Sequence, residues 1–140
     1  MASKIETKLL MSIIDFQSRI QRKLGASLSA HGIGLTEYLV LNQLYMAANQ
    51  KMRRSDLAEL VGLSPSGITR LLNPMEKIGL VEKEGNPRDA RVSLVALSKA
   101  GRKIFEESSI SFEHTSAELF NALEKKQVNE LSQLFRIIAK

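Results

Sequence analysis

The sequence predicts a mainly α-helical protein that carries one small β-hairpin. Three observations support this fold class. Apolar residues recur at intervals of three and four over most of the chain, as they do on one face of an α-helix. Capping residues and glycines separate these stretches. Only residues 80–97 differ, because two short β-type runs, LVEKEG and VSLVAL, flank the turn NPRDAR.

Composition and charge exclude some function classes and leave others open. The 140 residues suffice for one domain with a sizeable core. The absence of cysteine excludes disulfides, thiolate metal sites and thiol redox sensors. We expect a cytoplasmic protein, because no apolar run approaches the ~20 residues that cross a bilayer and the sequence shows no signal peptide. The net charge of +5 permits an anionic partner, which a few placed cations would have to bind because no segment is polybasic.

The first two predicted helices occupy the N-terminal third of the chain. Residues 5–30 form a long amphipathic helix, and Gly32 and Gly34 end it. Its apolar stripe is Ile5, Leu9, Ile13, Phe16, Ile20, Leu24 and Leu28. Thr36 is a suitable N-cap for a second helix that runs to about Ala48. The side chains that we expect this helix to bury are Leu39, Val40, Leu44 and Ala47.

A short third helix is predicted over Arg54–Val61, with Gly62 and Leu63 forming its end. The position before it, where a Ser or Thr cap is usual, holds Arg53. Cations at a helix N-terminus oppose the helix dipole. Arg53 and Arg54 are therefore either tolerated surface residues or phosphate contacts.

The fourth predicted helix is the most informative. Ser64 is a good N-cap, Pro65 occupies the first helical position, and Gly79 ends the helix. One face is apolar and consists of Ile68, Leu71, Leu72, Met75 and Ile78. The opposite face consists of Ser66, Thr69, Arg70, Asn73 and Lys77. All five can donate hydrogen bonds and none is acidic, so this face suits phosphates or base edges.

Pro74 lies inside this helix, where it removes the hydrogen bond to the Arg70 carbonyl and clashes with it. We expect a kink near residues 70–74. The base-reading part would then be confined to Ser64–Asn73.

Two helices joined by a tight turn, followed by a strand pair, make a winged helix-turn-helix, with NPRDAR as the tip of the wing. Asp89 can accept hydrogen bonds from Arg91 or Arg88 and hold a guanidinium extended. A narrow minor groove attracts such an arginine. In isolation the same loop would be a solvated turn with a salt bridge worth under ~1 kcal/mol. Its place after a donor-rich helix favours the wing.

Two terminal helices complete the prediction. Ser98 caps a long helix through about Leu123, and a last helix covers about Lys125–Ala139. The terminal helices carry more apolar surface than a small head can cover. A partner subunit is the natural cover, and packing within one chain is the alternative.

The sequence resembles the MarR (multiple antibiotic resistance regulator) family of winged helix-turn-helix regulators. The resemblance rests on an ordered set of motifs: LA-x-L-x-GLS at 57–64, TRLL at 69–72, MEKIGLVEK at 75–83, Asp89-x-Arg91 and L-S-x-x-G at 97–101. It implies a homodimeric, ligand- or stress-responsive regulator in one domain. The winged core would span about 36–97. The dimerisation helices would span about 4–30 and 98–140.

The resemblance and the donor pattern together predict a DNA interface. The recognition helix would lie in the major groove, where Arg70 and Thr69 would discriminate bases. The residues expected to fix phosphates or register are Ser64, Ser66, Asn73 and Lys77, with Arg53 and Arg54 as weaker phosphate contacts. In the wing, Arg91 would enter the minor groove, Asp89 would orient it, and Arg88 would bind adjacent phosphates. The expected partners are a palindromic double-stranded operator, a second copy of the chain and a possible small-molecule effector, whose pocket the sequence does not identify.

An enzyme is a poor interpretation. His31 and His114 are the only bases of neutral pKa, and no catalytic motif, metal-ligand spacing or cofactor loop accompanies them. His31 faces an effector pocket or is a solvated residue at a helix end. The alternative function is a winged-helix protein-interaction module that does not read DNA. Such a surface would need exposed apolar anchors, whereas the donor-rich face and the wing arginines favour DNA.

Overall fold

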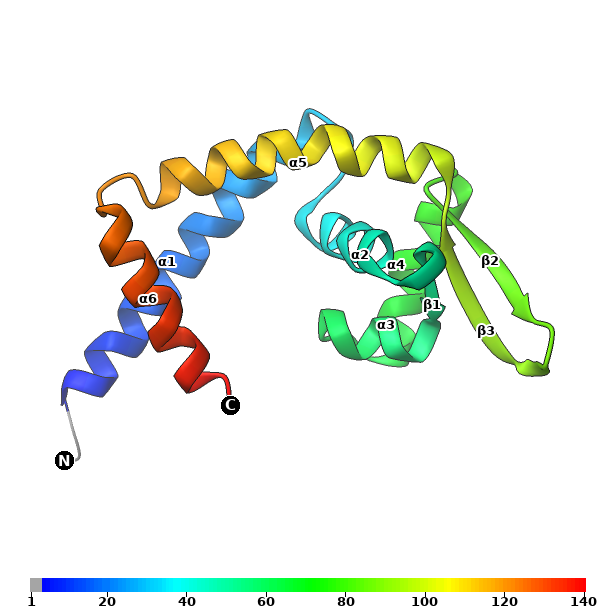
Figure 1. Cartoon of the computed structure of the whole chain (residues 1–140), viewed down its shortest axis with the longest axis horizontal. Helices are drawn as coiled ribbons and strands as arrows, with labels where there is room; N and C mark the ends of the chain where they lie inside the picture. Colours follow the sequence, from blue (N-terminus) through cyan, green and yellow to red (C-terminus); the bar gives the residue numbers. More distant parts are fainter. Residues whose placement is uncertain (1–3) are drawn as a thin grey trace.

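The computed structural model describes residues 4–140, which form six α-helices and a three-stranded antiparallel sheet (Figure 1). The helices are α1 (Lys4–Ser29), α2 (Leu35–Met46), α3 (Arg54–Val61), α4 (Pro65–Lys77), α5 (Lys99–Leu119) and α6 (Lys125–Ile138). The strands are β1 (Lys51–Arg53), β2 (Val81–Asn86) and β3 (Asp89–Leu97), in the order β1–β3–β2. Within residues 4–140 no helix is long and apolar enough to cross a membrane.

The molecule has a head and a pair of terminal helices that α5 connects. Helices α2, α3 and α4 and the sheet form the head, whereas α6 and the N-terminal part of α1 lie at the opposite end of α5 (Figure 1). The core of the head buries side chains from every head helix and from β3, among them Leu44, Leu57, Leu72 and Val95. The predicted class, mainly α-helical with a small β wing, is confirmed.

Aromatic rings attach α5 to the head. The ring of Tyr38 on α2 stacks on Phe105 and Phe112 of α5, with centroid separations of 5.2 and 4.5 Å. Tyr45, two turns further along α2, packs on Phe105 at 4.7 Å. Aromatic pairs of this kind stabilise a fold by more than the burial of their apolar area alone. Helix α5 is therefore fixed to the head at Phe105 and Phe112 and extends beyond them toward α6.

The predicted ends of α3 and α4 are confirmed in detail. Gly62 and Gly79 both have positive φ, 73° and 81°, which glycine adopts without a Cβ penalty. The next residue in each case donates back to a carbonyl of the last turn, Leu63 to Ala58 and Leu80 to Met75. The Ser64 hydroxyl accepts from the Gly67 N–H at 3.0 Å and caps α4. The end of α3 at Gly62 and the cap of α4 at Ser64 together form the tight turn between the two helices.

The prediction for α2 was wrong in two respects. Its N-cap is Gly34, not Thr36, because the Glu37 carboxylate accepts from the Gly34 N–H at 2.7 Å. Leu39, expected in the core, is 38% exposed, and Ala47 is half-buried. This helix is apolar on several sides, so periodicity does not identify its inner face; the packing buries Tyr38, Val40, Leu41 and Leu44.

Smaller corrections concern the ends of other elements. Strand β1 was not predicted, since three residues carry no periodicity; it pairs with the outer edge of β3. Helix α5 ends at Leu119, not near Leu123. Ile78, expected on the apolar face of α4, follows the last helical residue and is exposed. Helix α4 continues through Pro74 to Lys77 without interruption, and a bend of its axis stays a prediction.

The junction between α4, the wing and α5 is closely packed. The Ser98 hydroxyl accepts from the Gly101 N–H and lies within hydrogen-bonding distance of the Gly79 and Leu80 carbonyls. Gly101 is buried, and a Cβ there would overlap the Leu80 carbonyl oxygen. Only glycine fits this contact between α5 and the end of α4.

We predict that Gly101→Ala destabilises the protein by about 1–3 kcal/mol, because the backbone of Leu80 must move to admit a methyl group. Gly25→Ala is the matched control, since that Cβ would have nothing within 4 Å and alanine favours the helix. Urea unfolding of both variants measures the difference. An unchanged stability for Gly101→Ala would contradict the close packing at this junction.

Candidate functional site

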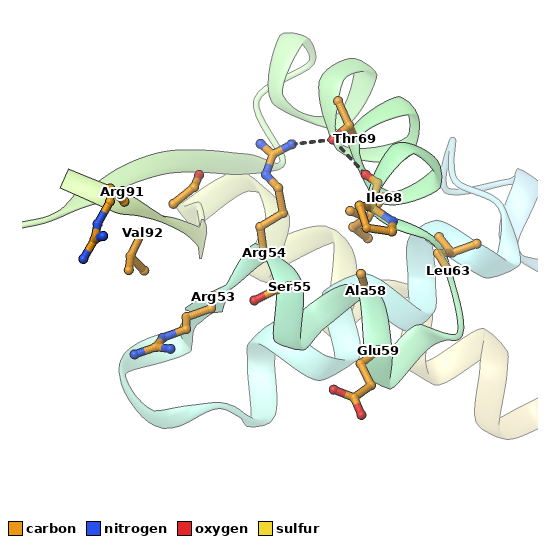
Figure 2. A pocket seen from close by; sticks show the side chains of 12 residues that line it. Arg53, Arg54, Ser55, Ala58, Glu59, Leu63, Ile68, Thr69, Arg91 and Val92 are labelled. Atoms are coloured by element: carbon orange, nitrogen blue, oxygen red, sulfur yellow. Dashed lines mark hydrogen bonds between the residues drawn. The ribbon is translucent and has the colours of Figure 1, made fainter. Parts of the chain in front are cut away.

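A concavity of about 610 Å³ opens between the start of α3, the start of α4 and the wing (Figure 2). Arginines from three elements line it, namely Arg53 of β1, Arg54 of α3 and Arg91 of β3. Polar groups from α4 and β3 add Thr69 and Ser93, and Glu59 is the acidic residue of the lining. The fold thus gathers cations that are up to 38 positions apart in the sequence onto one face of the head.

The donor face of α4 is confirmed as a surface next to this concavity. Ser66, Arg70, Asn73 and Lys77 are exposed, whereas Ile68, Leu72 and Met75 are buried on the opposite side. The Ser64 hydroxyl is partly committed, because it caps the helix and lies 3.2 Å from the Ser66 hydroxyl. The exposed face can therefore donate to acceptors of a ligand that lies along the helix.

Thr69 is less available than the sequence suggests. Its hydroxyl donates to the Pro65 carbonyl at 3.0 Å and accepts from Nη1 of Arg54 at 3.1 Å (Figure 2). A hydroxyl has one proton and two lone pairs, so one acceptor position remains. Thr69 can accept one further hydrogen bond or offer its methyl group, but in this arrangement it has no proton to donate.

The wing arginine is held by a carboxylate, as predicted. Nε and Nη2 of Arg91 donate to the two oxygens of Asp89 at 3.1 and 3.3 Å, and the Arg91 backbone N–H donates to the same carboxylate at 3.0 Å. Of the two candidate donors, Arg91 rather than Arg88 makes this pair. Its side chain is nevertheless 91% exposed, so the guanidinium is oriented and still accessible.

The register of the hairpin explains why Arg91 projects. Gly85 pairs with Ser93, but the next residue, Asn86, pairs with Asp89. Residues 90–92 of β3 thus have no counterpart on β2. Such an irregularity twists the strand and re-aims its side chains. The exposed Arg88 lies at the tip, where its N–H donates to the Asn86 side chain at 2.8 Å.

The electrostatics of the wing follow from the same contacts. The Arg91 guanidinium lowers the pKa of Asp89 below its usual value, and the Arg91 backbone N–H lowers this pKa further. Desolvation acts in the opposite direction, and the charge of Arg53 adds a smaller lowering. Arg53 belongs to β1 but lines the same concavity as Arg91.

The two arginines at the start of α3 differ in their surroundings. Arg53 is exposed and occupies the N-cap position without a side-chain cap bond. Arg54 is half-buried, bonds Thr69, and has an Nε atom that is shielded from solvent with no acceptor. Arg54 is therefore not a freely solvated surface residue. Sequence reasoning missed its bond to Thr69, because 15 positions and a turn separate the two residues.

The histidines do not form a catalytic site. His31 was expected to be solvated or to face a pocket, but its Nε2 lies 2.8 Å from the Ser111 hydroxyl of α5, and the residue is half-buried. The end of α1 packs on α5 there, so His31 is only partly solvated. His114 pairs with Glu118 on the surface at 2.8 Å. Among residues 4–140 no cluster of His, Asp or Glu could hold a metal ion.

Comparison with known proteins identifies a family resemblance over the head. Residues 31–92 match the MarR family. Among curated proteins, the chain is 24% identical to the HTH-type transcriptional regulator PrsX of Escherichia coli, over 95% of this chain and 87% of that protein. It is 26% identical to the transcriptional repressor MprA of E. coli K12, over 93% and 72%.

Solved structures extend the likeness to the terminal helices. AbsC, a MarR family regulator from Streptomyces coelicolor, superposes with a TM-score of 0.90 at 21% identity, covering 99% of this chain and 95% of AbsC. A cysteine-to-serine mutant of MarR from E. coli, complexed with operator DNA, gives a TM-score of 0.87 at 25% identity, over 95% and 94%. Sco3205 from S. coelicolor, in complex with DNA, gives 0.90 at 21%, over 99% and 88%.

We predict that Arg91→Gln raises the pKa of Asp89 towards its ordinary value of 3.8, because the largest cause of the lowering is removed. The ion pair between Asp89 and Arg91 is present above the lowered pKa of Asp89 and is lost as the pH falls through that pKa. Carboxyl NMR titration measures the change. Arg53→Gln is the control and should raise the pKa less, and an equal rise in both variants would contradict the paired geometry.

Proposed function

Because the chain belongs to the MarR family of winged helix-turn-helix transcriptional regulators, we propose that it is a sequence-specific repressor that binds double-stranded DNA as a homodimer. The observation that carries the proposal is the juxtaposition of an acid-free donor face on α4 with a braced, exposed arginine on the wing. Both border the same concavity. Two relatives of the same fold were solved with DNA, which supports the same ligand here.

In this proposal α4 lies in the major groove, which is wide enough to admit a helix and presents a distinct donor and acceptor pattern for each base pair. Arg70 is exposed on the donor face and reads bases. Ser64, Ser66, Asn73 and Lys77 fix phosphates or register. Thr69 contributes through its methyl group or its remaining acceptor position, since its proton is already used.

The wing contributes a second contact in the neighbouring minor groove. Arg91 enters the groove, where negative potential favours a guanidinium, and Asp89 keeps it extended. Arg88 at the tip binds the flanking phosphates. Preorganisation by Asp89 lowers the entropy that Arg91 loses on binding.

The unpaired surfaces of the terminal helices support the homodimer. No residue of α6 is buried in the single chain, although one side of it carries Leu134, Phe135, Ile137 and Ile138. Helix α1 also carries exposed apolar side chains: Ile5, Leu9, Leu10 and Met11 are between 54% and 78% exposed. Exposed apolar surface on two terminal helices supports an interface, and a second copy provides a matching one.

Regulation completes the proposal. Repression follows the relative MprA, which is a transcriptional repressor. A small-molecule effector that changes DNA affinity, and a cytoplasmic location, follow from the family resemblance. The concavity of about 610 Å³ lies on the proposed DNA face, and an effector pocket is not assigned.

We predict a homodimer that selects a palindrome from random DNA, with half-sites about one duplex turn, ~34–36 Å, apart. Sedimentation measures the assembly, and sequencing of the bound fragments measures the site. Leu134→Glu with Phe135→Glu on α6 should yield monomers and lose the palindrome. A monomeric wild type at micromolar concentration, or enrichment of isolated half-sites, would contradict the proposal.

Arg70→Ala should weaken binding to the selected duplex by about 1–3 kcal/mol relative to random duplex, because a bidentate contact to a base is lost. Titration of both duplexes at one salt concentration measures the difference. Lys77→Ala is the control and should weaken both equally. An equal loss on both duplexes for Arg70→Ala would demote it to a phosphate contact.

Asp89→Asn tests the wing most sharply, because bracing and net charge predict opposite results. Removing a negative charge should by itself tighten DNA binding, whereas loss of the brace frees Arg91 and should weaken it. We expect weaker binding, and Arg91→Ala should also lower the salt slope by about one ion. Glu84→Gln on β2 is the charge control. Tighter binding by Asp89→Asn would leave NPRDAR as a basic turn only.

A further inference from the structure

Arg54 occupies an unusual position for a charged residue. Its side chain rises from the first position of α3 and ends between Thr69 and the wing strand (Figure 2). Nη1 donates to the Thr69 hydroxyl at 3.1 Å, which fixes the guanidinium against α4. A guanidinium has five N–H donors, so one bond to a hydroxyl leaves most of its capacity unused.

The cost of this arrangement points to a ligand. Nε of Arg54 is shielded from solvent and has no acceptor among the described residues. Burying an unpaired donor of a charged group destabilises the free protein, and such groups call for a specific explanation. A tether between α3 and α4 alone would not need a charge. An anion at the guanidinium would recover part of the electrostatic free energy that burial removes.

The proposed docking mode supplies the anion. A strand of the sugar-phosphate backbone separates each major groove from the neighbouring minor groove. If α4 occupies one and the wing the other, that backbone must pass between them. The concavity lies between these two elements, and Arg53, Arg54 and Arg91 line it.

We propose that this concavity seats the DNA backbone between the two grooves, and that Arg54, held in position by Thr69, binds a phosphate there. The inference rests on the proposed function and deepens it. It also assigns Thr69 a new role, as the residue that positions Arg54. The bond between their side chains joins the first helix of the motif to the recognition helix, so a phosphate contact also fixes the height of α4 in its groove.

The test compares salt dependence on two duplexes, one selected from a random pool and one of random sequence. Arg54→Gln should lower the salt slope of binding by about one ion on both, since a phosphate contact is independent of sequence. Arg22→Gln on α1 removes the same charge from an exposed residue that does not line the concavity, and it should leave the slope unchanged. Arg54→Lys keeps the charge and should retain the slope with weaker binding. Thermal melting establishes that each variant is folded.

Thr69→Val then tests the positioning role. It should weaken binding to the random duplex in the Arg54 protein but not in the Arg54→Gln protein, because the hydroxyl acts through Arg54. Equal weakening in both backgrounds overturns this role. An unchanged salt slope for Arg54→Gln overturns the phosphate contact, and so does a loss of affinity confined to the selected duplex. In either case, binding of the selected duplex by the wild type still supports the proposed function. A wild type that binds neither duplex overturns both.

Discussion

The geometry of the head depends on the close contact between Gly101 and the Leu80 carbonyl, beside the buried Ser98 hydroxyl. At this junction the end of α4, the base of the hairpin and the start of α5 meet. The contact sets the direction in which the wing leaves α4, because β2 begins directly after Leu80. It also sets the direction of α5, which the Tyr38 ring holds on the head and which carries the terminal helices away from it. One junction therefore determines the spacing of both proposed DNA contacts and their relation to the terminal helices.

Preorganisation describes the rest of the candidate interface. Asp89 holds Arg91, Thr69 holds Arg54, and Ser64 caps the helix that presents Arg70. Each pairing restricts a long or terminal group before a ligand arrives, which reduces the entropy lost on binding. Each also limits what the partner can do. The Thr69 hydroxyl cannot donate to a base while it serves the Pro65 carbonyl and Arg54, so fixing one donor removes another.

The head and the terminal helices differ in how far their apolar side chains are buried within one chain. The head buries its apolar side chains within one chain, because its helices and the sheet enclose a core on several sides. Helix α6 and the N-terminal part of α1 lie at the far end of α5, away from the head, although Leu28 near the end of α1 is buried in the head core (Figure 1). Their exposed apolar faces are consistent with a chain whose free energy of folding includes burial against a second copy.

The sequence by itself determined the elements with strong local signals. A few consecutive residues specify each of these elements through short-range chemistry. They are the helix ends at Gly62 and Gly79, the caps at Ser64 and Ser98, the donor face of α4 and the Asp89–Arg91 pair. Only the tertiary structure decided which face of the apolar α2 is inner, that three residues of β1 join the sheet, and that Arg54 reaches Thr69. These features depend on which surfaces meet across the fold. Local periodicity carries no information about such contacts, because any side of an apolar helix or any short polar segment can be buried or paired once a neighbour lies against it.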